Sequence, residues 1–183
     1  MSDVFPPEEP SSSVELQAQP HSREAEEAVL GAVLINREKY FEIAQFLRSD
    51  DFYIVRNRWI WEAFVTLNEK RIPIDFLTVC QTLEQQNRLS EAGGPAYITA
   101  LINQTPTSLH AEAYAHIVEE TSLRRRMLAA ANTLASLAYQ RQQSIDTIIE
   151  EAEKAVFGLS ERRVQHDLQP IQSVLSNYYD RID

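Results

Sequence analysis

The feature that most constrains the fold is a segment from Ser108 to about Arg141 that contains neither glycine nor proline. Such a segment can form one helix about 50 Å long, because an α-helix rises about 1.5 Å per residue. Its apolar residues follow two stripes that are rotated from each other. One stripe consists of Ala113, Ile117, Leu128, Ala131, Ala135 and Ala138, and the other consists of Met127, Leu134 and Leu137. A helix that is apolar on two sides needs two packing partners.

A second helix is predicted after the polar break "QRQQS". Ser144 is a candidate N-cap, and the apolar residues that follow it recur at a spacing close to that of a coiled coil. The two helices should therefore form an antiparallel hairpin, which cannot bury both of its faces by itself. We predict that the hairpin self-associates through Met127, Leu134, Leu137, Ile145, Ile148, Ile149, Ala152 and Val156.

The residues before the hairpin predict several shorter amphipathic helices and no strands, so the fold class is all-α. Ser22 is a candidate N-cap, followed by Glu24, Glu26 and Glu27 at the positive end of the helix dipole. Asp75 should cap a later helix whose inward residues are expected to be Leu77, Cys80 and Leu83, with Phe76 and Val79 alongside. A further helix should begin at Pro95, after a turn at Gly93 and Gly94.

These patterns divide the chain into four parts. Residues 1–21 are an acidic, Pro/Ser-rich tail that we expect to be disordered, 22–106 a globular helical head, 107–162 the hairpin, and 163–183 a linker with a truncated linker helix. In the last part Ile171, Val174, Leu175 and Tyr178 lie at helical spacing, yet no capping residue ends the pattern. We interpret this as a helix cut from a longer protein.

Composition excludes several classes of function. The net charge of −10 offers no positive field for phosphates, so strong nucleic-acid binding by this chain alone is not expected. The four glycines match neither a P-loop nor a dinucleotide-binding spacing, and the histidines lack a metal-ligand spacing, so no cofactor or metal is expected. The single cysteine and the absence of a signal peptide or long apolar run favour a cytoplasmic protein without a membrane segment.

The remaining candidate groups favour structural roles. The arginines at 124–126 fan out around a helix, and Glu120 can pair with Arg124, so we interpret this cluster as a solvated junction rather than a nucleic-acid contact. The pair Asp50 and Asp51 is interpreted as solvated, and Trp61 as part of the core. No catalytic constellation is present in the sequence, so we expect this chain not to be an enzyme.

Several stretches in order resemble the N-terminal domain of the bacterial replicative DNA helicase, the DnaB family. They are "EAEEAVLGAVLIN" at 24–36, "DDFYIVRNRWIWEAFVTLNEKRIPIDFLTVCQTLEQQNRL" at 50–89, "GGPAYITALINQTPTSLHAEAYAHIVEE" at 93–120 and "RRRMLAAANTLASLAY" at 124–139. The resemblance covers about residues 20–183. The acidic tail is longer than the family's, and we assign it no role.

The resemblance implies a collar without its motor. In that family a helical head and hairpin precede a linker and an ATPase domain; hairpins pair the heads, and three pairs form a hexameric ring. It also implies binding of primase and, in some lineages, of a loader, whereas ATP and Mg²⁺ would belong to the motor, a 5′–3′ helicase in the full-length protein. Ile171, Val174, Leu175 and Tyr178 would then dock on a neighbouring motor. The alternative is a free-standing helical adaptor or regulator that mimics the collar and binds helicase or primase.

Overall fold

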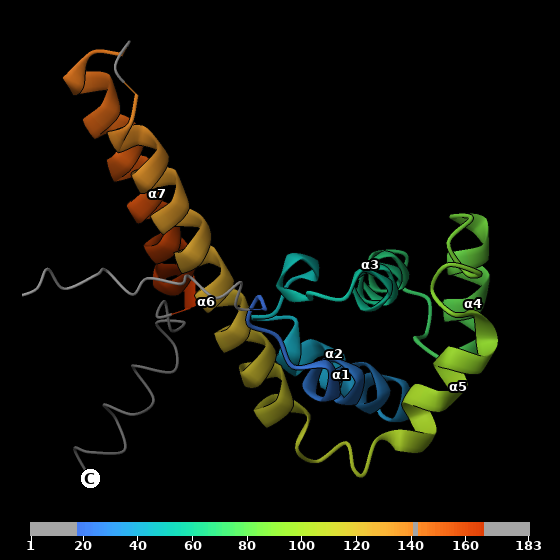
Figure 1. The fold of residues 1–183 in the computed structure, drawn as a ribbon. Helices are drawn as coiled ribbons and strands as arrows, with labels where there is room; N and C mark the ends of the chain where they lie inside the picture. The colour runs from blue at the N-terminus through green and yellow to red at the C-terminus, as the bar shows by residue number, and fades with distance from the viewer. Residues whose placement is uncertain (1–17, 141–142, 167–183) are drawn as a thin grey trace, which may run out of the picture.

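In the computed structural model, residues 18–140 and 143–166 are described, with side-chain environments up to residue 159, and this part of the chain is helical without strands. The helices are α1 (Arg23–Ile35), α2 (Glu38–Ile43), the 3-10 helix η1 (Ser49–Asp51), α3 (Val55–Glu69), α4 (Phe76–Gln85), α5 (Gly94–Gln104), α6 (Ala111–Ala138) and α7 (Ile145–His166). Figure 1 shows α1 to α5 gathered in a head from which α6 and α7 project as an antiparallel hairpin. The predicted all-α class is confirmed.

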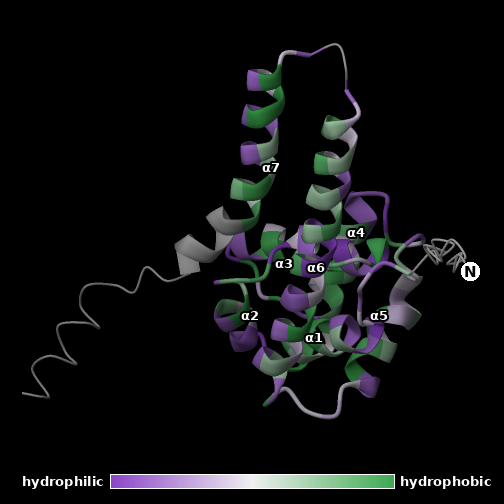
Figure 2. Ribbon diagram, turned by 60° about the vertical axis from the view of Figure 1, so that its left-hand side comes forward, coloured by the Kyte–Doolittle hydropathy of each residue, from purple (hydrophilic) through white to green (hydrophobic). Residues whose placement is uncertain are grey.

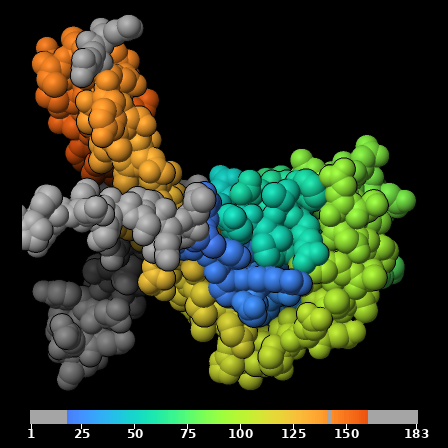
Figure 3. All heavy atoms as spheres, in the orientation of Figure 1, coloured from blue at the N-terminus to red at the C-terminus, as the bar shows by residue number. Residues whose placement is uncertain are grey.

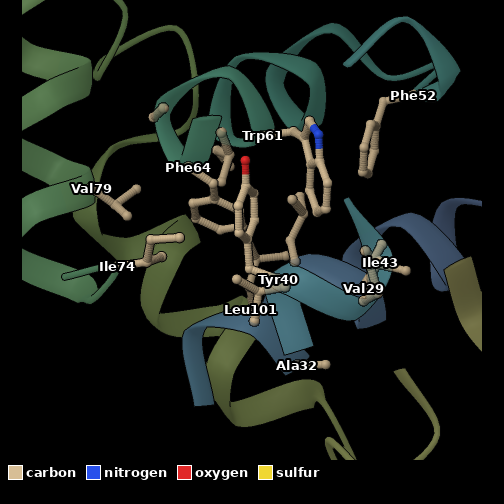
Figure 4. Packing of buried hydrophobic residues seen from close by; sticks show 14 of the residues in the cluster. Val29, Ala32, Tyr40, Ile43, Phe52, Trp61, Phe64, Ile74, Val79 and Leu101 are labelled. Atoms are coloured by element: carbon tan, nitrogen blue, oxygen red, sulfur yellow. The ribbon is translucent and has the colours of Figure 1, made fainter. Parts of the chain in front are cut away.

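The head is built around an aromatic cluster (Figure 4). The ring of Trp61 on α3 lies 5.5 Å from that of Tyr40, 5.3 Å from that of Phe52 and 5.9 Å from that of Phe64, measured between centroids. All four side chains are buried, and aliphatic residues from α1, α4 and α5 surround them. Large aromatic side chains bury about 150–250 Å² each, so they contribute strongly to such a core. The prediction that Trp61 belongs to the core is therefore confirmed.

The predicted helix starts agree with the structure. The Ser22 hydroxyl accepts a hydrogen bond from the Ala25 amide at 3.2 Å, and the Asp75 carboxylate accepts one from the Thr78 amide at 2.9 Å. Helix α5 begins at Gly94, one residue before the predicted start, and both Gly93 and Gly94 have positive φ angles of 97° and 67°. Glycine adopts this backbone conformation without steric penalty, which explains the paired glycines at the turn.

The prediction of which residues of α4 point inward was partly wrong. Leu77 was expected to point inward, but 74% of its surface is exposed, whereas Val79 and Leu83 are buried. Helix α4 packs against both α3 and α5, so its buried side is the sector that faces the angle between those two helices. Leu77 precedes the buried Val79, Thr82 and Leu83 by two, five and six residues, so at about 100° per residue it lies on nearly the opposite side of α4.

Helices α1 and α5 cross at close range at Gly31. A Cβ atom at this position would lie 1.9 Å from Thr105 Oγ1 and 2.3 Å from the Leu101 carbonyl oxygen. Both distances are far below van der Waals contact, so only glycine allows the two backbones to approach this closely. The crossing brings α5 against the same side of α1 that borders α6.

Helix α6 belongs to both parts of the molecule. Its first turns bury Ala111, Ala115, Val118 and Ser122 against the head, and its remaining turns pack against α7. The space-filling view in Figure 3 shows the hairpin projecting away from the rounded head. The predicted segment 108–141 is thus one continuous helix, slightly shorter at both ends than the sequence pattern indicated.

Candidate interaction surfaces

The hairpin carries apolar side chains that are left exposed among the described residues. On α6 these are Met127 and Leu128, and on α7 they are Ile145, Ile149, Val156 and Phe157, each close to half exposed or more. Ile145, Ile149 and Val156 are spaced by four and seven residues, so they lie on one side of α7. Figure 2 shows hydrophobic residues distributed along both hairpin helices. An uncovered apolar row of this kind is a candidate protein interface.

The residues predicted for self-association fall into two groups in the structure. Leu137 is buried, and Leu134, Ile148 and Ala152 are half-buried, so these four lie toward the contact between α6 and α7. Met127, Ile145, Ile149 and Val156 remain exposed and are available to a partner. The residues predicted for linker-helix docking, Ile171, Val174, Leu175 and Tyr178, lie outside the described residues, as does the acidic stretch 1–17.

The head has a groove of about 390 Å³ between α1, α5 and α6. Its lining is mainly apolar, from Ala25, Ala28, Leu101, Tyr114 and Ile117, and Glu24 and Glu27 also line it. A groove with these properties can accept an apolar side chain. The groove could not be predicted from the sequence, because it forms where α1 packs against α5 and α6, which are distant from α1 in the chain.

A buried carboxylate joins α1 to the start of α3. Glu26, with 1% of its surface exposed, accepts hydrogen bonds from the amides of Tyr53 and Ile54 at 2.7 and 3.2 Å and from Asn57 Nδ2 at 2.9 Å. Burial raises the pKa of Glu26, while these hydrogen bonds act in the opposite direction. Ile54, the N-cap residue of α3, has no side chain that could cap the helix, and Glu26 instead satisfies the amides of Ile54 and of the residue before it from another helix.

The network continues from α3 to α5. Tyr97 Oη lies 2.7 Å from Asn57 Oδ1 and 3.1 Å from Glu27 Oε1, and the guanidinium of Arg56 stacks 3.9 Å above the Tyr97 ring. Burial raises the pKa of Tyr97, and the negative charge of Glu27 adds to the increase, so this hydroxyl remains a hydrogen-bond donor at neutral pH. The sequence signal for this network is the absence of a capping side chain before α3.

The arginine cluster was only partly interpreted correctly. Arg124 pairs with Glu120 at 2.6 Å on the exposed side of α6, as predicted. Arg125 instead points toward the head and bonds to the backbone carbonyls of Pro20 and Asp51, so the cluster is not simply solvated. Asp51 was also expected to be solvated, but only 2% of its surface is exposed. Neither outcome could be predicted, because the sequence does not show which distant segment will cover a charged side chain.

Within the described residues, no three side chains of His, Cys, Asp or Glu converge on a position where they could hold a metal ion. In the same part of the chain, no helix combines the length and the hydrophobicity that crossing a bilayer requires. Burial raises the pKa of Cys80, with a further increase from Glu84, and this keeps the thiol protonated and poorly reactive at neutral pH. The exposed apolar row on the hairpin and the groove on the head are surfaces suited to protein contacts.

A family model described as the DnaB-like helicase N-terminal domain matches residues 18–120. This chain belongs to that family. The replicative DNA helicase DnaC of Bacillus subtilis (strain 168) is 35% identical to this DnaB-like domain over 164 residues, which are 90% of this chain and 36% of the relative. The replicative DNA helicase DnaB of Geobacillus stearothermophilus is 34% identical over the same extent. The DnaB-like chain thus spans about a third of the length of these relatives.

Solved structures show the same fold as this DnaB-like domain. The N-terminal domain of DnaB helicase from Mycobacterium tuberculosis superposes with a TM-score of 0.74 at 27% identity and covers 77% of this chain and 99% of its own. The N-terminal domain of DnaB helicase from Helicobacter pylori, described together with its interactions with primase, gives a TM-score of 0.56 at 25% identity and covers 64% and 91%. The resemblance inferred from the sequence is confirmed.

Proposed function

We propose that this chain is the collar of a replicative DNA helicase, which joins subunits of the ring through its hairpin and recruits primase through its surface. The observation that carries the proposal is the uncovered apolar row on a hairpin of a DnaB-like N-terminal domain. Pairing of two hairpins would bury this row, and burial of apolar surface is the main favourable term in protein association. Pairs of heads would then assemble as a trimer of dimers in the cytoplasm.

Recruitment of primase is proposed because the similar Helicobacter pylori domain is described with its interactions with primase. A helicase loader is a further candidate partner, on the family resemblance alone. The groove between α1, α5 and α6 is lined by none of the exposed apolar residues of the hairpin named above. Primase binding and pairing should therefore be separable by mutation.

The pairing is tested by introducing charge into the apolar row. We expect Leu128→Glu combined with Ile149→Glu to shift the chain from dimer to monomer in sedimentation equilibrium across micromolar concentrations. These side chains are 51% and 50% exposed, so the variants should fold normally. Leu77→Glu is the matched control, because Leu77 is more exposed but lies on the head. A wild-type chain that stays monomeric at high micromolar concentration would contradict the proposal.

Recruitment is tested with the primase encoded by the same genome. We expect the wild-type chain and the Leu128→Glu/Ile149→Glu variant to bind primase in a pull-down and in titration calorimetry, with weaker apparent affinity for the variant if two heads share one primase. Absence of binding by the wild-type chain would contradict this part of the proposal. The helicase motor and its ATP and Mg²⁺ are assigned to sequence outside this chain, so the purified chain should show no ATP turnover.

A further inference from the structure

Polar contacts join α6 to the head at the base of the hairpin, where α6 leaves the head. Ser122 on α6 donates a hydrogen bond from its hydroxyl to Asp51 Oδ1 at 2.7 Å, and both residues are almost fully buried, with 3% and 2% of their surfaces exposed. The other carboxylate oxygen of Asp51 accepts the Arg48 amide at 2.7 Å, which closes the turn of η1. The carboxylate that accepts from Ser122 is thus held in place by a hydrogen bond within η1, independently of α6.

Arg125 makes the next contact along α6. Its Nη1 donates to the Pro20 carbonyl at 2.8 Å and its Nη2 donates to the Asp51 carbonyl, so one guanidinium joins α6 to η1 and to the segment before α1. The guanidinium also lies 5.5 Å from the centroid of Tyr53, and the ring of His21 stacks on Tyr53 at 4.4 Å. A planar guanidinium with two fixed acceptors orients the backbone to which it is attached better than a single point charge does.

These two residues occupy the position at which α6 leaves the head. The residues of α6 buried against the head end at Ser122, and the next buried residue among those described is Leu137, which is outside the head's core. Beyond Arg125 the helix continues to Ala138 with α7 as its neighbour. The part of α6 after Ser122 is therefore a lever about 24 Å long, and a rotation of about 10° at its root displaces its tip by about 4 Å.

We propose that Ser122 and Arg125 form a latch that fixes the direction in which the hairpin leaves the head. The apolar contacts of Ala115 and Val118 attach α6 to the head, but small aliphatic contacts tolerate a rotation that the hydrogen bond of Ser122 and the two hydrogen bonds of the Arg125 guanidinium do not. If hairpins pair as in the proposed function, the latch also sets the separation between paired heads. The latch itself does not depend on pairing.

The experiment measures the angle as a distance in the full chain. Spin labels are placed at Leu77→Cys on the head and Tyr139→Cys at the end of α6, two highly exposed positions, in a Cys80→Ser background. Labelled protein is diluted into an excess of unlabelled protein, so that distances between paired chains do not contribute. We expect a narrow distance distribution for the latched chain and one that broadens or shifts by about 4 Å in Arg125→Ala, as the lever length implies.

Arg124→Ala is the matched control, since Arg124 is the adjacent arginine on the solvent side and pairs only with Glu120 among the ion pairs of the described residues. We expect Arg124→Ala to leave the distribution unchanged. An unchanged distribution in Arg125→Ala, or equal broadening in both variants, would overturn the latch. If circular dichroism shows that Arg125→Ala has lost helix, Ser122→Ala carries the test, and an unchanged distribution in that variant overturns the proposal. Because these labels report distances within one chain, failure of the latch is distinguishable from failure of hairpin pairing.

Discussion

Replacing Gly31 by alanine should separate α1 from α5. The added Cβ would lie 1.9 Å from Thr105 Oγ1, 2.3 Å from the Leu101 carbonyl oxygen and 3.0 Å from its carbon. Rotation of the Thr105 side chain can relieve the first contact. The other two involve the backbone of α5, so relief requires the helices to move apart, and that movement disturbs the packing of Leu101 in the core.

The magnitude follows from two opposing terms. Overpacking a core typically costs about 1–3 kcal/mol, and a contact with rigid backbone belongs at the upper end of this range. Alanine is favoured over glycine in a helix by about 1 kcal/mol, which offsets part of the loss. We therefore expect Gly31→Ala to lower the free energy of unfolding by about 2 kcal/mol, as the difference between these terms. Adding Thr105→Ala should recover only part of this loss, because the contact with the Leu101 oxygen remains.

Urea denaturation followed by tryptophan fluorescence measures the effect, since Trp61 is in the core of the head. Gly158→Ala is the matched control: Gly158 lies within α7, and its added Cβ would have no neighbour within 4 Å. Circular dichroism should show that this control is neutral or stabilising by about 0.5–1 kcal/mol. If Gly31→Ala had the same free energy of unfolding as the wild-type chain, or lost less of it than Gly158→Ala, the close approach of α1 and α5 would be refuted.

Two further predictions concern the buried network. Glu26→Gln should destabilise the head by about 1–3 kcal/mol at pH 7, because the NH₂ group of the new glutamine would face the N–H donors that now bond to the carboxylate. Because the pKa of Glu26 is raised in the folded state, ionisation of this carboxyl lowers the stability of the fold. The stability that the group contributes is fully present below its pKa in the unfolded chain and is lost as the pH rises through its pKa in the folded chain. The wild-type chain should therefore gain stability relative to Glu26→Gln as the pH is lowered from 7 toward 4, and parallel urea midpoints over this range would contradict the assignment. Tyr97→Phe should cost about 1–3 kcal/mol by leaving the buried Asn57 oxygen without its donor, whereas Tyr139→Phe, at an 86% exposed position, should change stability by less than about 0.5 kcal/mol. Equal midpoints for the two tyrosine variants in the same assay would show that the network contributes nothing.

Local features of the fold could be predicted because they depend on neighbouring residues. The capping side chains of Ser22 and Asp75 and the glycine pair at 93–94 each act within one turn of the helix they start. The segment that forms α6 could be predicted because it contains no residue that interrupts a helix. The spacing of apolar residues likewise depends only on the period of the helix. For the same reason, the exposed apolar row on the hairpin could be anticipated, although its separation from the residues buried between α6 and α7 could not.

The partners of Glu26, Asp51 and Arg125 could not be predicted in this way. Each side chain makes at least one hydrogen bond to a group 27 or more residues away, and the sequence gives the same charged residue whether it is solvated or buried. The inward face of α4 was wrong for a related reason, since two neighbouring helices selected the buried sector. The family resemblance supplied the fold and the expected role, but it assigned no contact to these residues.

The sequence by itself determined that this chain is all-α, where its helices begin, and that its hairpin carries more apolar surface than the hairpin can cover. These properties follow from backbone hydrogen bonding and from the helical period, both of which act over a few residues. Only the tertiary structure decided which carboxylates are buried, which arginine holds the hairpin to the head, and where glycine is required between helices. Those outcomes depend on the groups that packing brings together, because a buried polar side chain is stable only where distant donors or acceptors meet it.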